Sequence, residues 1–252
     1  RLVLKQDMEL AMEVQQTLLP REAPVLPGLD IAAASIFCDA TGGDYYDFLS
    51  SAAPDGPCCD IIIGDATGHG IAAALLMTTS RALLRGCATQ QVLPGAQLAK
   101  ANTLLCQDTD MTGRFVTLFY LRLEAGGIAP EGKLLWARAG HDPGMLFDPK
   151  TDTFRELQGK GIALGVSLDY VYETFSCGGL LPGQVLVLAT DGAWEARNGQ
   201  GEMFGKERFK EVVRRYATRT SKDLVEALQQ AIREYQGDAP VEDDVTVVVI
   251  KA

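Results

Sequence analysis

The sequence predicts an α+β fold, a central antiparallel β-sandwich flanked by helices in α-β-β-α layers. Short apolar runs separated by Gly, Pro and Asp turns fill the middle of the chain, and runs joined in this way pair as antiparallel hairpins. Helical patterns come in pairs rather than alternating with single strands, which disfavours a doubly wound parallel sheet. Because many strands have to be covered, two packed sheets between two helical layers are the economical arrangement.

The first segment, residues 1–20, predicts a helix that enters the domain. It is rich in helix formers and ends at Pro20. Its apolar residues recur near helical spacing, at Leu4, Met8, Ala11, Met12 and Leu19. The chain opens on Arg1, and two interpretations stand open: a helix that continues from an upstream sensory region, or a trimmed terminus. We expect residues 21–252 to form one domain.

The remaining elements follow from apolar periodicity and turn residues. Strands are expected at residues 29–37, 60–64, 115–123, 133–139, 144–147, 172–175, 184–189 and 245–250. Helices are expected at residues 71–87, 95–107, 206–216 and 221–235. Residues 50–57, rich in Ser, Pro and Gly, are expected to form a loop.

Composition limits the classes of function. The 23 basic and 33 acidic residues give a net charge of -10, which argues against a nucleic-acid surface and suits acidic groups that bind cations. The six cysteines show no CxxC pair, so reduced thiols are favoured over disulfides or zinc. The sequence has no signal-peptide layout and no apolar stretch long enough to span a bilayer. A cytoplasmic location is therefore expected.

Four short acidic strings, far apart in the chain, carry the functional information. They are GGDYYD from Gly42, GDATGHG from Gly64, TDGAWE from Thr190 and EDDVTVVV from Glu242. Each places aspartates at the edge of an apolar run or a Gly turn, and each alone would also be an ordinary turn or cap. Hard divalent cations such as Mg²⁺ and Mn²⁺ take oxygen ligands from a few carboxylates. Together the strings suggest one carboxylate-lined metal site.

Two of the strings share a strand-to-turn geometry. Asp65 follows an apolar strand and precedes a Gly-rich turn, so its carboxylate and the carbonyl of Ala66 can face one cation together. Asp191 repeats this arrangement after the apolar run 185–189, and Gly192 lets the chain turn immediately. We expect Asp65 and Asp191 to be partners.

The other two strings place aspartates at the beginning of an apolar segment. Gly42 and Gly43 permit close approach of the backbone before Asp44. Asp243 and Asp244 stand just before the final strand, and only one of them can point into a given cleft because successive strand side chains face opposite ways.

In their order and spacing the strings closely resemble the SpoIIE/RsbU-type branch of the metal-dependent type 2C (PPM) serine/threonine protein phosphatases. The resemblance rests on GGDYYD, GDATGHGIAAAL, TDGAWEARN and DDVTVVV, with VQQTLLP upstream and AGHDP at Ala139 to Pro143, and it runs from about Glu13 to the C-terminus. It implies a type 2C β-sandwich with a centre of two Mn²⁺ or Mg²⁺ ions at one end.

Carried over position by position, the resemblance implies the metal ligands Asp44, Asp65, the carbonyl of Ala66, Asp191 and Asp243. Asp65 would bridge the two ions, and Asp44 would bind directly or through water. Asp47 and Asp244 would be supporting groups, with the choice between Asp243 and Asp244 left open.

The implied chemistry is in-line attack on phosphorus by a metal-bridging water, without a protein nucleophile. The sequence holds two histidines, each in a Gly-flanked loop. His69 is a candidate general acid, against a structural role in its loop, and His141 is expected to be structural. Several arginines could grip a phosphate, but the sequence selects none of Arg81, Arg85, Arg114 and Arg138.

The resemblance implies a protein serine/threonine phosphatase that acts on a small regulatory protein, a STAS-type anti-sigma-factor antagonist or a similar partner-switching protein. Upstream sensing would act through the first helix, and a homodimer through that helix is a further expectation.

One alternative is a non-catalytic phosphatase-like signalling or binding module. Another is a metal-dependent hydrolase of nucleotides or small phosphate esters. The likeness of GGDYYDF to the GGDEF string of cyclic-dinucleotide synthases fails because Tyr45 replaces its second acidic residue.

Overall fold

The computed structural model describes the backbone of residues 2–39, 41–53, 56–88, 92–124 and 127–252, and the side chains of these residues except 2–9 and 51–57. Within these ranges the strands form two five-stranded sheets in which all neighbouring strands are antiparallel. The first sheet has the order β1 (Asp30–Ile36), β10 (Val245–Lys251), β9 (Val185–Ala189), β6 (Gly144–Asp148) and β7 (Thr153–Leu157). The second has the order β2 (Asp44–Ala53), β3 (Gly56–Ala66), β4 (Val116–Glu124), β5 (Lys133–Ala139) and β8 (Phe175–Gly178).

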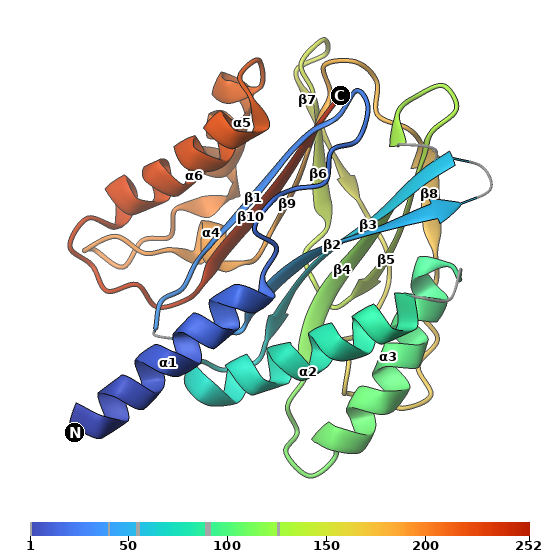
Figure 1. The fold of residues 1–252 in the computed structure, drawn as a ribbon. Coiled ribbons are helices and arrows are strands. Elements are labelled where there is room, and N and C mark those ends of the chain that lie inside the picture. Colours follow the sequence, from blue (N-terminus) through green and yellow to red (C-terminus); the bar gives the residue numbers. More distant parts are fainter. Residues whose placement is uncertain (1, 40, 54–55, 89–91, 125–126) are drawn as a thin grey trace.

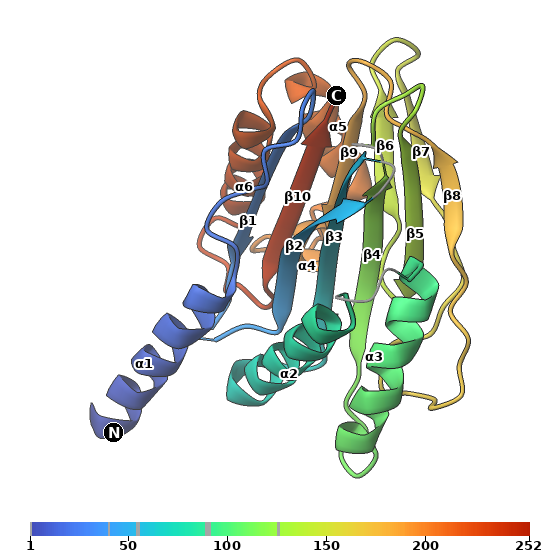
Figure 2. The same ribbon diagram turned by 45° about the vertical axis from the view of Figure 1, so that its right-hand side comes forward.

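Helices cover the outer face of each sheet (Figure 1). The helices α5 (Gly205–Tyr216) and α6 (Ser221–Gln236) pack on the first sheet, and α2 (Gly70–Ala88) and α3 (Pro94–Thr109) pack on the second. Figure 2 shows the two sheets between these layers. The predicted α-β-β-α sandwich is therefore confirmed.

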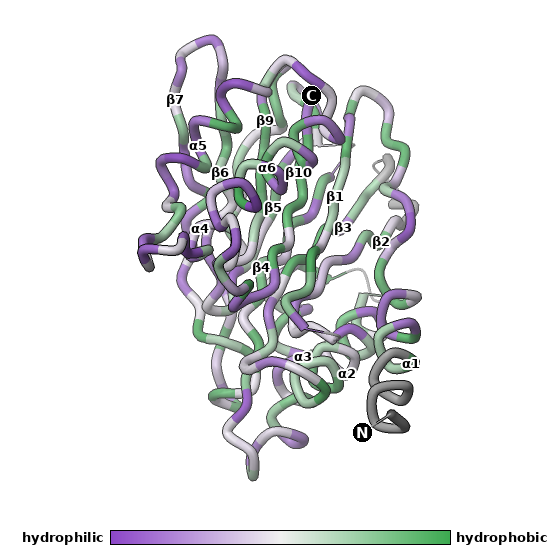
Figure 3. The backbone as a smooth tube through the Cα atoms, turned by 90° about the vertical axis from the view of Figure 1, so that its left-hand side faces the viewer, coloured by the Kyte–Doolittle hydropathy of each residue, from purple (hydrophilic) through white to green (hydrophobic). Residues whose placement is uncertain are grey.

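The apolar runs of the sequence are continuous because the central strands are buried on both faces. In β3, Ile61 and Ile63 face the other sheet, while Ile62 between them faces α2 and α3. In β10, Val248 faces the other sheet and Val247 faces α5 and α6. This alternation follows from the period of two residues in a strand. In Figure 3 the strands are coloured mainly as hydrophobic, while hydrophilic residues gather on α5 and the loops near it.

The helix α1 (Leu2–Leu18) lies outside the layers, in contact with α2 (Figures 1 and 2). It ends where the sequence predicts, before Pro20. The side chains of Leu4 and Met8 lie outside the described residues, so its expected apolar face is seen only from Ala11 onward. Among the described residues, every helix is too short or too polar to traverse a lipid bilayer.

Two expectations for single elements were wrong, and three elements of the described residues were not expected. The strand expected at residues 172–175 begins only at Phe175, because Tyr172 is held by its buried side chain in the core against α3 rather than by strand pairing. Most of the loop expected at residues 50–57 is strand, since β2 runs to Ala53 and β3 begins at Gly56, and residues 54 and 55 lie outside the described residues. The strands β2 and β7 and the short helix α4 (Gly192–Glu195) were not expected.

Candidate metal centre

The pairing of β2 with β3 brings two of the acidic strings together. Asp44, the first residue of β2, lies directly opposite Asp65 near the end of β3. The backbone N–H of Ala66 donates to the carbonyl oxygen of Gly43 at 3.1 Å. By the alternation of each strand, both carboxylates lie on the side that faces the other sheet, in line with Ile61 and Ile63.

Glycine is required at both positions before Asp44. A Cβ atom on Gly43 would lie 2.6 Å from the carbonyl oxygen of Ala66 and 3.1 Å from Oδ1 of Asp65. A Cβ atom on Gly42 would overlap Oδ2 of Asp244 and the ring of Phe37. The close approach of the backbone that the sequence predicted is therefore present, and it concerns three of the four strings.

The other sheet brings the third and fourth strings to the same place. Thr190 follows β9, and its N–H donates to the carbonyl oxygen of Thr246 in β10 at 3.1 Å. Asp191 and Gly192 come next and enter α4. The chain turns at Gly192 as expected, and a Cβ atom there would overlap the carbonyl oxygen of Asp244. All four strings thus meet at one end of the sandwich.

Burial and mutual repulsion perturb the two paired carboxylates. Burial, followed by the charges of Asp191, Asp243 and Asp244, raises the pKa of Asp65 to about 8. Burial also raises the pKa of Asp44 well above its usual range, with Asp65 and Asp244 adding to the effect. A carboxylate ionises less readily when water is excluded and like charges are near, so a bound cation would stabilise the ionised form of both.

Asp191 and Asp243 are perturbed in the same way. Burial raises the pKa of Asp191, and the charges of Asp243 and Asp142 raise it further. Burial likewise raises the pKa of Asp243, with the N–H of Asp244 lowering it and the charges of Asp244 and Glu195 raising it. The four carboxyl groups therefore form one acidic cluster in which ionisation of each is disfavoured.

Within the described part of the chain, no lysine or arginine forms an ion pair with these four carboxylates. Among the described residues, the ion pairs that lysines and arginines form involve other carboxylates. In the same ranges, no group of three or more His, Cys, Asp or Glu side chains lies close enough together, as the side chains stand, to hold a metal ion. The arrangement is an open group of oxygen donors, which fits Mg²⁺ or Mn²⁺ better than the compact nitrogen and sulfur sites of zinc.

Asp243 and Asp244 differ in what their carboxylates already bind. Asp244 is buried, and it accepts hydrogen bonds from the N–H groups of Cys38 at 2.8 Å, Gly43 at 2.8 Å and Asp44 at 3.3 Å. Its oxygens hold the segment that leads into β2. Asp243 accepts from the N–H of Asp244 at 2.8 Å through Oδ1, which leaves Oδ2 for another partner.

Asp47 points away from the carboxylate cluster, toward α2. It is three residues after Asp44 and therefore lies on the other face of β2. Arg85 of α2 donates to both of its oxygens, at 2.6 and 2.7 Å, and Tyr45 donates its hydroxyl at 2.7 Å. Asp47 is fully buried, so its contribution is to tie β2 to α2.

Sequence reasoning missed Thr190, which links the two sheets at this end. Its hydroxyl donates to Oδ2 of Asp44 at 2.8 Å and accepts from the N–H of Thr246 at 3.0 Å. Thr190 is fully buried. The only signal in the sequence is its place directly before Asp191, and that position does not reveal a partner 146 residues away.

The two histidines have different surroundings. Nδ1 of His69 lies 3.1 Å from a carboxylate oxygen of Asp39, and 80% of the His69 side chain is exposed. His141 is buried, and its Nδ1 lies 2.9 Å from the hydroxyl of Thr117, the residue opposite Asp65 on β4. Burial lowers the pKa of His141 to about 4, so it is a neutral ring at physiological pH.

The arginines considered as phosphate ligands have structural partners. Arg81 and Arg85 lie beside Asp47. Arg138 donates to the carbonyl oxygens of His141 and Gly159, both at 2.8 Å. Arg114 donates to the carbonyl oxygen of Thr67 at 3.3 Å, in the loop that follows the carboxylate cluster. The geometry selects none of them as a ligand for substrate.

Comparison with known families gives one match over most of the chain. Residues 55–252 match the family model described as stage II sporulation protein E (SpoIIE). Among curated proteins, the phosphoserine phosphatase RsbU of Bacillus subtilis (strain 168) is 30% identical over 248 residues, which cover 98% of this chain and 70% of RsbU.

Solved structures show the same fold. The SiaA-PP2C domain of Pseudomonas aeruginosa superposes with a TM-score of 0.82 at 24% identity, over 99% of this chain and 97% of that domain. The catalytic domain of the serine/threonine phosphatase PstP, solved in complex with two manganese ions, gives a TM-score of 0.60 at 16% identity over 88% of this chain and 97% of that domain.

Proposed function

The chain belongs to the SpoIIE family, in the SpoIIE/RsbU branch of the type 2C phosphatases, and we propose that it is a metal-dependent protein serine/threonine phosphatase. The observation that carries the proposal is the meeting of Asp44, which is buried, with the more accessible Asp65, Asp191 and Asp243 at one end of the sandwich, where the pKa values of all four carboxyl groups are raised. RsbU, one of the curated relatives, is named a phosphoserine phosphatase, which favours the same activity here.

The proposed ligands are the carboxylates of Asp44, Asp65, Asp191 and Asp243 and the carbonyl oxygen of Ala66. We assign the bridging role to Asp65 because the charges of Asp191, Asp243 and Asp244 all raise its pKa. Asp243 is favoured over Asp244 because the Asp244 carboxylate is already used by three backbone N–H groups. Two Mn²⁺ or Mg²⁺ ions held there would lower the pKa of a water molecule and neutralise the phosphoryl oxygens.

The protein residues around this group would hold and orient it. Thr190 fixes one oxygen of Asp44 by its hydrogen bond, and Asp244 fixes the backbone of the same residue. We propose His69 as the general acid that protonates the leaving oxygen, because its ring is exposed and lies near enough to Asp243 to lower the pKa of that carboxyl group. Asp39 would orient that ring.

The proposed substrate is a phosphoserine or phosphothreonine on a small regulatory protein, a STAS-type anti-sigma-factor antagonist or a similar partner-switching protein. Residues 1–20 would connect an upstream sensory region to a phosphatase domain of residues 21–252, with dimerisation through the first helix. A cytoplasmic location is part of this proposal.

One experiment separates an enzyme from a non-catalytic module of the same fold. Hydrolysis of a phosphoserine peptide is measured with and without Mn²⁺ for the unsubstituted chain, Asp65→Asn, Asp191→Asn and Asp152→Asn. We expect Mn²⁺-dependent hydrolysis that falls more than about 100-fold in the first two variants, since losing a ligand should cost at least as much as losing an outer partner. Asp152, in the exposed turn between β6 and β7, should tolerate the change. Absence of metal-dependent hydrolysis in the unsubstituted chain would favour the non-catalytic module.

A further inference from the structure

We infer that Gln15 of α1 is a positioning residue of the metal centre: its side-chain amide clamps the backbone of Gly42 and thereby sets the place of Asp44 and Asp244. The inference deepens the proposed function. It rests on that function in one respect only, which is that the carboxylate group binds metal. It gives α1 a defined route to the site.

The clamp consists of two complementary hydrogen bonds. Nε2 of Gln15 donates to the carbonyl oxygen of Gly42 at 2.6 Å, and the N–H of Gly42 donates to Oε1 of Gln15 at 3.1 Å. Gln15 is buried, with 4% of its surface exposed, although both of its neighbours in the helix are exposed. A buried amide that satisfies both groups of one residue fixes that residue in position and orientation.

The residues after Gly42 are bound to the carboxylate group from the other side. The N–H groups of Gly43 and Asp44 both donate to Oδ2 of Asp244, and the carbonyl oxygen of Gly43 accepts from Ala66. The segment 42–44 is therefore held between Gln15 on α1 and Asp244 before β10. Displacing Gly42 moves the backbone to which Asp44 belongs.

This segment has little room to adjust by itself. The space where a Cβ atom of Gly42 would lie is filled by Asp244 and Phe37, and the space beside Gly43 is limited by Ala66 and Asp65. Because close-packed contacts transmit displacement instead of absorbing it, a shift of α1 that pulls on Gly42 should reach Asp44 and Asp244.

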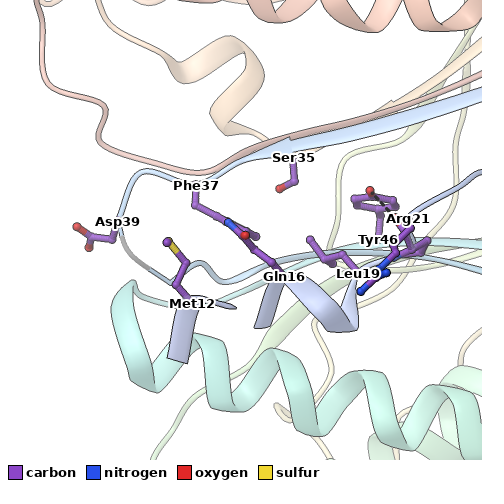
Figure 4. Close-up of a pocket in the computed structure, with 9 residues that line it drawn as sticks. Met12, Gln16, Leu19, Arg21, Ser35, Phe37, Asp39 and Tyr46 are labelled. Atoms are coloured by element: carbon purple, nitrogen blue, oxygen red, sulfur yellow. Dashed lines mark hydrogen bonds between the residues drawn. The ribbon is translucent and has the colours of Figure 1, made fainter. Parts of the chain in front are cut away.

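Other residues of α1 whose side chains are described border a pocket or solvent. A pocket of about 370 Å³ separates part of the helix from β1 and β2, and Met12 and Gln16 of α1 face Ser35, Phe37 and Tyr46 across it (Figure 4). Leu10 and Val14 of α1 are 60% and 56% exposed. Beyond the helix end, Tyr46 donates its hydroxyl to the carbonyl oxygen of Pro20 at 3.2 Å.

The adjacent residue supplies a matched control. Gln16 carries the same side chain on the same helix, is exposed and lines the pocket instead of contacting Gly42. A substitution at Gln16 changes the helix in the same chemical way without touching the segment 42–44. Any difference between the two positions reports the clamp itself.

The test compares Gln15→Met with Gln16→Met in the full chain. Methionine keeps the approximate length and apolar stem of glutamine and loses both hydrogen bonds. Mn²⁺ affinity is measured by titration calorimetry, and hydrolysis is measured over a range of Mn²⁺ concentrations. We expect Gln15→Met to weaken Mn²⁺ binding by roughly 10- to 100-fold, the range found when outer partners of metal ligands are removed. Turnover at saturating Mn²⁺ should return close to that of the unsubstituted chain, and Gln16→Met should bind Mn²⁺ within about 2-fold of it.

Thermal unfolding without metal identifies a variant that fails to fold. In that case Gln15→Asn, which keeps the amide but shortens its reach, takes the place of Gln15→Met and should show a smaller loss of Mn²⁺ affinity. Equal Mn²⁺ affinity in the Gln15 and Gln16 variants would overturn the inference, as would an unsubstituted chain that binds no Mn²⁺. If the affinity difference is found in a chain that hydrolyses no phosphoester, the clamp stands and the proposed phosphatase activity falls.

Discussion

Asp44 lies directly opposite Asp65 in the antiparallel pair of β2 and β3, and a hydroxyl from the other sheet, that of Thr190, donates to Asp44 at 2.8 Å. The hairpin supplies two carboxylates without any long-range packing. The other two come from the ends of β9 and β10, so they join the first pair only when the two sheets have packed together. The site is thus a product of the whole sandwich.

Thr190→Val should weaken metal binding while preserving the shape of the side chain. Valine removes the donor to Asp44 and the acceptor for the N–H of Thr246, both in a buried position. We expect Mn²⁺ affinity to fall roughly 10- to 100-fold and the free energy of unfolding to fall by about 1–3 kcal/mol. Calorimetry and urea unfolding measure the two. Thr153→Val, on the exposed start of β7, is the control, and a Thr190 variant that behaves like it would contradict the structural role.

Asp243→Asn and Asp244→Asn should fail in different ways. Asp243 has a carboxylate oxygen to offer a cation, so Asp243→Asn should lose Mn²⁺ binding by more than the roughly 10- to 100-fold typical of outer partners and keep its metal-free stability. Asp244 holds three backbone N–H groups, so Asp244→Asn should lower the metal-free free energy of unfolding by on the order of 2 kcal/mol. Unfolding in a chelator and Mn²⁺ titration separate the two effects. The reverse pattern would make Asp244 the ligand.

The sequence predicted those parts of the fold that have a local signal. The apolar runs in β3, β9 and β10 alternate between two buried faces, so their burial is visible without tertiary information. Gly42 and Gly43 also carry a local signal, because two glycines before an aspartate indicate close approach of the backbone. The strand predicted from Tyr172 onward was wrong because burial of a side chain does not require a strand. Tyr172 is buried in the core while its backbone lies outside any strand.

The partners of the carboxylates could not be predicted, because they lie far away in the chain. Gln15 bonds the main chain of Gly42, a partner without a side chain and therefore without a signature in the sequence. The strand β2 was not predicted because Asp47 interrupts its apolar pattern. The sequence does not show that this buried carboxylate pairs with Arg85, 38 residues later. Local patterns thus placed the candidate ligands, and tertiary contacts decide which groups support them.

Asp47→Ala should destabilise the protein more than the loss of an exposed ion pair. The change leaves the hydroxyl of Tyr45 and the guanidinium of Arg85 without their buried acceptor. We expect a loss of about 2–4 kcal/mol in the free energy of unfolding. This loss lies toward the lower end of the range for removing one partner of a buried ion pair, because Arg85 is partly exposed and solvent weakens the pair. Asp152→Asn, which breaks the exposed pair with Arg214, should cost less than about 1 kcal/mol. Equal losses in urea unfolding would show that the buried pair contributes little.

The buried His141 should make the protein less stable in acid. Burial lowers its pKa in the folded state to about 4 from the value of 6.5 for a free side chain, with Asp142 opposing the shift and Arg138 adding to it. Between these values the unfolded chain binds more protons than the folded protein, so stability increases with pH. The contribution is complete above pH 6.5 and is lost as the pH falls toward 4.

The size of this effect can be isolated with His141→Gln, which keeps a polar group and removes the titration. A shift of this width corresponds to at most about 3 kcal/mol. The free energy of unfolding of the unsubstituted chain, minus that of the variant, should therefore decrease by up to this amount as the pH is lowered from 7 to 4. The subtraction removes the titration of the carboxylates, which both proteins share. The free energies of unfolding of the two proteins, measured with urea, could instead change equally with pH over this range. That result would mean that the ring is protonated equally easily in the folded and unfolded states.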